Sequence, residues 1–317
     1  MKTRREKQKQ QKPKTRKNNS HLLTDKCAPK RDFEFTCYDK KSLNIMRNAW
    51  NKHAKKNETQ KIKSKKPKEI WQFFKDNIST CKRESCWLQQ PFIQSKKTNK
   101  LKYYTFAPKY PDSWYNNKIE WLSSQDIHRV MRQYKREIPE FDFKGPSPID
   151  YDSKDIYNPE KKCVQEDLCM FDLKSQLQSG KTKVGIIFNL DPHNKGGSHW
   201  VALFIDCKKH KIYYFDSYGD AIPDRIMRLV ETVKQQAREM SKKFSFYYND
   251  RRHQYKNSEC GMYCLYFIIA LLKNKPFDKF LNKRVKDEEM EETRKKYFNY
   301  KEGKDPEINN PDKEVNN

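Results

Sequence analysis

The pattern of apolar and polar positions predicts a folded region of short strands and helices from about residue 115 onward. Residues 184–190 (VGIIFNL) form a continuous apolar run, which is typical of a strand buried on both faces. Residues 199–206 (HWVALFID) and 211–217 (KIYYFDS) are two strand-like runs joined by a few polar residues. This arrangement predicts a β-hairpin. Residues 244–248 add a short aromatic strand.

Two amphipathic helices are expected on either side of the hairpin. The first follows Trp121 and Leu122, with a serine as its N-cap, and has apolar residues at helical spacing as far as Tyr134. The second opens at Pro223 and carries one apolar stripe that ends at Met240. Strands clustered between helices, with an antiparallel hairpin among them, favour an α+β fold over a doubly wound one.

The segment 251–272 (RRHQYKNSECGMYCLYFIIALL) places Cys260 in front of an unusually apolar stretch. From Gly261 to Leu272 only tyrosine and cysteine interrupt the apolar run, which is too short to span a bilayer but long enough for a helix buried on all sides. Cys260 would then lie at a helix N-terminus, where free amide groups and the helix dipole stabilise a thiolate. The alternative is a buried cysteine that acts only as a small apolar residue.

A cysteine nucleophile needs a base, a group that orients the base, and donors for the developing oxyanion. His199 begins the first hairpin strand and Asp216 ends the second. A two- or four-residue loop would put Asp216 on the face of His199, whereas a three-residue loop would put it on the other face. Gln254 could donate beside the backbone amide of Cys260. Three other histidines are rival bases: His193, His210 and His253.

Charge and composition divide the chain further. It has 68 Lys and Arg against 42 Asp and Glu, a formal net charge of +26, and a mean hydropathy of −1.18. Such polarity predicts a compact core flanked by solvated segments. We expect a disordered basic tail at 1–30, a small helical region at 31–114 with a lysine-rich flexible linker at 52–68, a core at 115–298, and a disordered tail at 299–317.

Composition also bears on partners and compartment. The positive charge permits contact with DNA, although a lysine- and asparagine-rich composition alone could produce it. Neither a membrane span nor a secretory signal is evident, which predicts a soluble intracellular protein. The nine cysteines are odd in number and lack a framework spacing, so we expect reduced thiols. Their spacing to histidines does not suggest structural zinc.

The candidate site residues occur in motifs that resemble a known clan of cysteine proteases, the one that contains adenovirus protease and the SUMO-specific proteases. The matching motifs are Gly197-Ser198-His199-Trp200, Tyr214-Phe215-Asp216-Ser217, Gln254 and Glu259-Cys260-Gly261. Their order matches the clan, as do the seventeen-residue step from His199 to Asp216 and the position of Gln254 six residues before Cys260. Within the clan the chain looks most similar to processing proteases of large DNA viruses, such as those of African swine fever virus and giant viruses.

The resemblance implies a function for each matched residue. Cys260 would be the nucleophile, His199 the base, Asp216 its orienting group and Gln254 an oxyanion donor, with no metal or organic cofactor. Trp200 would wall a narrow channel that favours cleavage after Gly-Gly sites. The expected fold is an α+β SUMO-protease-like core with a small helical N-terminal region.

The expected function is a cysteine endopeptidase that processes viral structural polyproteins or core proteins, in the virion or in viral factories of the host cytoplasm. One alternative is an isopeptidase that removes ubiquitin-like modifiers such as SUMO. Another is a basic virion protein that binds nucleic acid and retains a vestigial protease site. The sequence does not determine the substrate or the oligomeric state.

Overall fold

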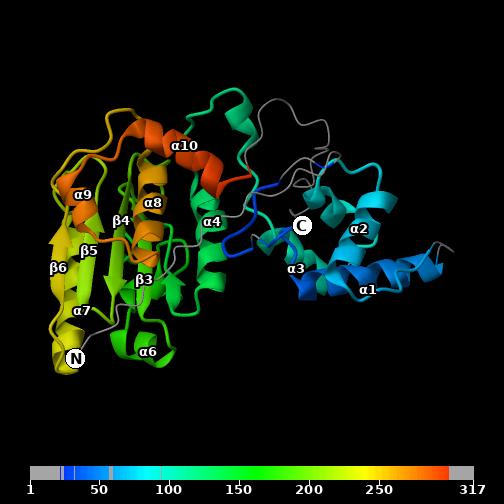
Figure 1. Ribbon diagram of the computed structural model, residues 1–317. Coiled ribbons are helices and arrows are strands. Elements are labelled where there is room, and N and C mark those ends of the chain that lie inside the picture. The colour runs from blue at the N-terminus through cyan, green and yellow to red at the C-terminus, as the bar shows by residue number, and fades with distance from the viewer. Residues whose placement is uncertain (1–21, 23–24, 32, 57–59, 94, 300–317) are drawn as a thin grey trace, which may run out of the picture. The chain divides into compact units, whose positions relative to one another are not determined.

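The computed structural model describes residues 22, 25–31, 33–56, 60–93 and 95–299 (Figure 1). These residues divide into two compact units between Phe106 and Ala107. The predicted core began at residue 115, but Tyr110 and Trp114 are buried with the aromatic residues of the second unit. Most of the predicted tails at 1–30 and 299–317 lies outside the described residues. The expectation of disorder is wrong for residues 25–30, because Asp25 and Ala28 are buried and Cys27 forms a disulfide with Cys37.

The first unit is helical, as expected. Its elements are α1 (Lys40–Lys56), α2 (Pro67–Asn77), the short 3-10 helix η1 (Glu84–Gln89) and α3 (Lys96–Tyr104). The predicted flexible linker at 52–68 is shorter than expected, since its ends belong to α1 and α2. Within it Ile62 is buried, and its backbone exchanges two hydrogen bonds with the Asn51 side chain. These contacts anchor at least this part of the lysine-rich segment.

Six cysteines are paired, so the expectation of nine reduced thiols is wrong. The disulfides are Cys27–Cys37, Cys81–Cys86 and Cys163–Cys169. Their Cα atoms are 5.2 to 6.6 Å apart, within the range that a disulfide spans. Local turns bring each pair together, which a search for metal-type spacings does not detect. The three free cysteines, Cys207, Cys260 and Cys264, are all buried.

The second unit is built on one mixed sheet with strand order β1-β3-β4-β5-β6, and β2 also pairs with β3. Its strands are β1 (Phe141–Phe143), β2 (Ser147–Pro148), β3 (Lys183–Asn189), β4 (Trp200–Asp206), β5 (Lys211–Phe215) and β6 (Ser245–Tyr248). The four predicted strands correspond to β3, β4, β5 and β6. Its helices are η2 (Asp112–Tyr115), α4 (Ser124–Glu137), α5 (Glu166–Cys169), α6 (Leu173–Gln178), α7 (Asp224–Glu239), α8 (Cys260–Leu272), α9 (Asp278–Asn282) and α10 (Asp287–Tyr297).

Two pairings in this sheet position the site. β4 and β5 form the predicted antiparallel hairpin, with Asp206 opposite Lys211 and Ala202 opposite Phe215. β5 and β6 run parallel, with Tyr214 beside Tyr248. Parallel strands end at the same edge of a sheet, so the loops that follow β5 and β6 emerge as neighbours.

The sheet is covered on both faces by helices (Figure 1). One apolar cluster joins α4, α8 and α10 to inward residues such as Ala202 and Phe204. The other joins α7 to the alternate residues, such as Leu203 and Tyr214. In α8 every residue except Tyr266 is buried, as the apolar run predicted. This burial on all sides fixes the start of α8 against the sheet.

The start of α4 is also defined. Ser123 is the N-cap, and its side chain and that of Asp126 exchange hydrogen bonds with each other's backbone amides in a capping box. Within the described ranges, no helix combines the length and apolar character that crossing a bilayer requires.

Candidate active site

Cys260 is the first residue of α8 and is 1 % exposed. The amide groups of the first helical turn have no partner within the helix, so they can stabilise negative charge at this point. Gly261 follows, and a β-carbon there would come within 3.0 Å of the Leu122 side chain. The close packing of Leu122 therefore favours glycine directly after the thiol.

His199 and Asp216 meet across the hairpin. The turn between β4 and β5 has four residues, which is one of the two lengths that put both side chains on one face. Nε2 of His199 lies 2.7 Å from Oδ1 of Asp216, and the two residues are 8 % and 1 % exposed. With Nε2 engaged in this way, Nδ1 is the ring nitrogen that can serve the cysteine.

The environment of His199 favours its protonated form. Burial on its own would lower the pKa of this imidazole, but hydrogen bonds with Asp216 and Cys260 and their negative charge outweigh it and raise the pKa to about 9. His199 is therefore in contact with both the thiol and the carboxylate. This arrangement suits an imidazolium held between a thiolate and a carboxylate.

Asn249 holds Asp216 in place from the neighbouring loop. Its Oδ1 accepts from the Asp216 amide at 2.9 Å, and its Nδ2 donates to the Asp216 carbonyl at 2.7 Å. The loops after β5 and β6 also touch at Gly219, whose φ is +76° and where a β-carbon would lie 2.8 Å from the Arg251 backbone. A side chain at position 219 would thus be strained and would push the two loops apart.

The contact between the loops that follow β5 and β6 also fixes Gln254, which is fully buried. The Ser217 carbonyl accepts from the amides of His253 and Gln254, and the Ser217 hydroxyl donates to Oε1 of Gln254 at 2.7 Å. Nε2 of Gln254 donates to the Lys256 carbonyl at 2.6 Å. One N–H of the side-chain amide is used there, which leaves the second for another acceptor.

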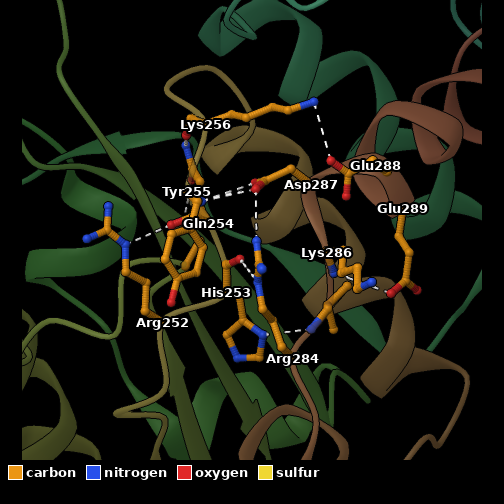
Figure 2. A network of polar contacts seen from close by, with 12 residues as sticks. Arg252, His253, Gln254, Tyr255, Lys256, Arg284, Lys286, Asp287, Glu288 and Glu289 are labelled. Atoms are coloured by element: carbon orange, nitrogen blue, oxygen red, sulfur yellow. Dashed lines mark hydrogen bonds and ion pairs between the residues drawn. The ribbon is translucent and has the colours of Figure 1, made fainter.

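A polar network ties this loop to the start of α10 (Figure 2). Asp287, at the start of α10, accepts from the Tyr255 amide at 3.1 Å and from the Tyr263 hydroxyl at 3.1 Å. Arg284 donates to the His253 carbonyl at 2.9 Å and also pairs with Asp287 at 3.2 Å. The segment that carries Gln254 is therefore tied to both α8 and α10.

A buried ion pair lies directly before the cysteine. Glu259 is fully buried, and its carboxylate meets Nε and Nη2 of Arg294 from α10 at 3.0 to 3.3 Å. The Arg294 guanidinium also lies 4.5 Å from the Trp114 ring centroid. Burial raises the pKa of Glu259, with Arg294 opposing that effect. The pair fixes the residue from which α8 starts.

The structure places the three rival histidines in other environments. His253 is buried, with Nε2 bonded to the Phe280 carbonyl at 2.9 Å and Nδ1 accepting from the Val285 amide at 3.0 Å. Burial lowers the pKa of His253 to about 4. His193 bonds to Asp150, and His210 lies in the turn at the far end of the hairpin, against Phe244. Of these candidates, only His199 has contacts with the cysteine and with a buried carboxylate.

Trp200 lies beside the site but is largely enclosed. It is 6 % exposed, belongs to the apolar cluster around α8, and donates its indole N–H to the Leu122 carbonyl at 3.1 Å. The neighbouring Trp121 is 41 % exposed. Trp200 therefore joins the segment before α4 to the start of β4, and the more accessible indole is that of Trp121.

Sequence reasoning missed several supporting residues, of which Tyr218 is closest to the chemistry. Its ring stacks on His199 with centroids 4.5 Å apart and planes 14° apart, and its amide donates to Asp216 at 2.9 Å. Burial raises the pKa of Tyr218, and the charge of Cys260 adds to that effect. Its position two residues after Asp216 was the available signal, since the second hairpin strand ends there.

Comparison with known proteins finds several proteases. Residues 153–306 match the model of the Ulp1 protease family, C-terminal catalytic domain. A protein named as a thiol protease from Acanthamoeba polyphaga mimivirus is 29 % identical over 86 % of this chain and 92 % of its own length. The SUMO-1 cysteine protease of African swine fever virus is 28 % identical over 75 % of this chain and 90 % of its own.

The fold also has a solved counterpart. The crystal structure of the African swine fever virus protease superposes with a TM-score of 0.59 and 24 % identity, covering 88 % of this chain and 98 % of the other. The chain is thus a cysteine peptidase with an α+β fold. Residues 153–306 are similar to the Ulp1 catalytic domain, and the relatives named here are viral proteases.

Proposed function

We propose that the chain is a viral endopeptidase in which Cys260 is the nucleophile, His199 the base and Asp216 the residue that orients the base. The observation that carries the proposal is the position of His199. Its ring is hydrogen-bonded to a buried carboxylate and is in contact with a thiol at the start of a buried helix. A buried cysteine with no catalytic function would not require this arrangement.

The proposed reaction is acyl transfer through a thioester. The Cys260 thiolate attacks the scissile carbonyl, and the oxyanion that forms accepts hydrogen bonds from the Cys260 amide and the free N–H of Gln254. Protonated His199 gives its proton to the leaving amine, which departs as the thioester forms. Neutral His199 then takes a proton from water, and the hydroxide attacks the thioester to release the acid and restore the thiolate beside protonated His199.

We further propose that the substrate presents Gly-Gly before the scissile bond. The support is the enclosure of the site, since Cys260, His199 and Trp200 are each less than 10 % exposed. A site enclosed in this way favours residues without side chains next to the scissile bond. A methyl group forced into filled space costs about 1–3 kcal/mol. Replacing either glycine by alanine should therefore reduce kcat/KM about tenfold or more.

A pair of matched substrates tests the proposal. One presents Gly-Gly-X in a linear peptide and the other presents the same Gly-Gly in an isopeptide bond to lysine. We expect cleavage after the second glycine, a higher kcat/KM for the linear peptide, and no turnover by Cys260→Ala. Preference for the isopeptide would favour removal of ubiquitin-like modifiers instead. Absence of cleavage of either substrate by folded wild-type protein would contradict the peptidase proposal.

The net charge of +26 favours one additional property, contact with DNA through the basic tail. Deleting residues 1–20 removes nine Lys and Arg and should flatten the dependence of DNA affinity on salt. Equal salt slopes for the full chain and the truncated chain would contradict this. Action on core proteins in the virion or in cytoplasmic viral factories would place the enzyme beside viral DNA.

A further inference from the structure

A stack of aromatic and cationic side chains runs outward from His199. The Tyr218 ring covers His199 at 4.5 Å, and the guanidinium carbon of Arg252 lies 5.1 Å from the Tyr218 ring centroid. Arg252 is also 4.9 Å from the Tyr255 ring, and Arg284 lies 4.1 Å from that same ring. Two loops and the segment before α10 thus contribute to one continuous row of flat groups.

The two arginines in this row differ in whether a carboxylate pairs with the guanidinium. Arg284 has a carboxylate partner, Asp287, at 3.2 Å, and its Nε donates to the His253 carbonyl. The Nε of Arg252 is bonded to the Gln254 carbonyl at 2.9 Å, but throughout the described ranges no carboxylate pairs with its guanidinium. Figure 2 shows Arg252 extending away from the Asp287 network. Arg252 therefore presents a cation without a compensating anion.

Arg252 is also accessible and held in place. The residue is exposed, as is Tyr255 at 59 %, whereas Gln254, to which it is bonded, is fully buried. Contacts with two rings and a backbone carbonyl reduce the freedom of the side chain before any ligand arrives. The two terminal nitrogens remain to form a fork, which matches the geometry of a carboxylate.

The Arg252 guanidinium lies close to the catalytic histidine. The stacking contacts place the Arg252 guanidinium at most about 10 Å from the His199 ring, a span that about three residues of extended chain cover. A peptide whose scissile bond lies at Cys260 would therefore bring a nearby side chain within reach of Arg252. The exposed, unpaired cation selects an acidic side chain.

We propose that Arg252 is a specificity-determining residue that binds an aspartate or glutamate of the protein substrate within about three residues of the scissile bond. This inference rests on the peptidase function proposed above. Tyr218 and Tyr255 position the guanidinium, and Tyr218 couples the acid-binding position to the catalytic imidazole. The carboxylate forms a charge-assisted pair with the two terminal nitrogens of Arg252.

The test uses Gly-Gly-X peptides in which each position within three residues of the scissile bond, other than the two glycines, carries Glu or Gln in turn. We expect one position at which Glu raises kcat/KM about tenfold over Gln, the usual effect of a hydrogen bond to a charged group. In Arg252→Gln that ratio should fall to about twofold or less, while turnover of the Gln peptide is retained. Arg252→Lys, which keeps the charge but loses the fork, should give an intermediate ratio.

Arg251→Gln is the matched control. Arg251 is adjacent, exposed and equally charged, but its Nε is bonded to the Leu281 carbonyl and it stacks on neither tyrosine. Arg251→Gln should keep the full Glu preference. Loss of the preference in both variants would show a general effect of positive charge and overturn the proposal, as would a preference that survives Arg252→Gln or the absence of any preference.

A binding measurement separates this inference from the peptidase proposal. The same peptides, labelled with a fluorophore, are titrated into Cys260→Ala protein and its Arg252→Gln double variant. A Glu preference in affinity that requires Arg252 supports the inference even if turnover is absent. If wild-type protein cleaves the Gln peptides but neither assay shows a Glu preference, the peptidase proposal stands and the assignment of Arg252 fails.

Discussion

The Ser217 hydroxyl donates to Oε1 of Gln254 at 2.7 Å, and both residues are fully buried. A primary amide can turn over and exchange its oxygen and nitrogen. The Lys256 carbonyl, which can only accept, keeps the amide nitrogen on its own side, and the Ser217 hydroxyl holds the oxygen on the other. Ser217 thus helps to fix the orientation in which the second N–H of Gln254 can reach an oxyanion.

Replacing Ser217 by alanine should reduce kcat more than it raises KM, because the interaction that is lost acts only in the transition state. Loss of an oxyanion donor lowers kcat by about 10²–10³, and Gln254→Ala should lose activity in that range. Ser217→Ala should keep a kcat about tenfold higher than that of Gln254→Ala. Adding Ser217→Ala to Gln254→Ala should change kcat little. Steady-state kinetics of the wild-type protein, the two single variants and the double variant complete a double-mutant cycle. Additive losses would mean that Ser217 acts independently of Gln254.

The three free thiols should differ in reactivity. Cys260 should react with an alkylating probe at neutral pH, whereas burial raises the pKa of Cys207 to about 12 and raises the pKa of Cys264 well above its ordinary value. Mass spectrometry of the labelled, unreduced protein identifies the site. Cys260→Ala should abolish turnover, while Cys264→Ser, one helical turn along, should retain the chemistry. Equal losses in two folded variants would mean that Cys260 is not the nucleophile.

The alkaline limb of activity should report on His199. The leaving amine needs the imidazolium, so kcat/KM should fall as pH rises through about 9, the pKa of His199. In Asp216→Asn the amide can still accept the imidazole hydrogen bond but carries no charge. The pKa of His199 should therefore fall, and the alkaline limb of the activity profile should move to lower pH. Asp216→Asn should also lose less activity than His199→Ala, since His199 transfers the proton. An unshifted limb in Asp216→Asn would contradict the assignment of Asp216.

The buried pair before the nucleophile should matter for stability. Arg294→Met leaves the Glu259 carboxylate buried without its cation, a change that costs about 3–5 kcal/mol in the free energy of unfolding. The double variant Glu259→Gln/Arg294→Met should recover part of that loss, because no unpaired charge remains. Lys234→Met, which breaks an exposed pair with Glu231 at 2.8 Å, is a control expected to cost less than about 1 kcal/mol. Urea unfolding compares the four proteins, and a similar cost for Arg294→Met and Lys234→Met would contradict a structural role for the buried pair.

The sequence by itself determined the central strands and the helix after Cys260, and it named the candidate site residues. The apolar run after Cys260 predicted a helix buried on all sides, since no polar face is present in residues 261–272. The hairpin restricted the His199–Asp216 contact to two loop lengths, and the structure has one of them, a four-residue turn. These inferences succeeded because strand alternation and helix burial are local patterns that neighbouring residues specify.

Only the tertiary structure decided which residues hold the site together. Asn249 reaches Asp216, and Ser217 reaches Gln254, because β5 and β6 pair in parallel across more than thirty residues of sequence. Arg294 meets Glu259 only because α10 packs on α8. Parallel pairing and helix packing depend on the whole core and leave no local spacing to detect. The disulfides were missed for a different reason. Their cysteines are only 5 to 10 residues apart, but whether such a pair closes depends on the turn that brings the two α-carbons together.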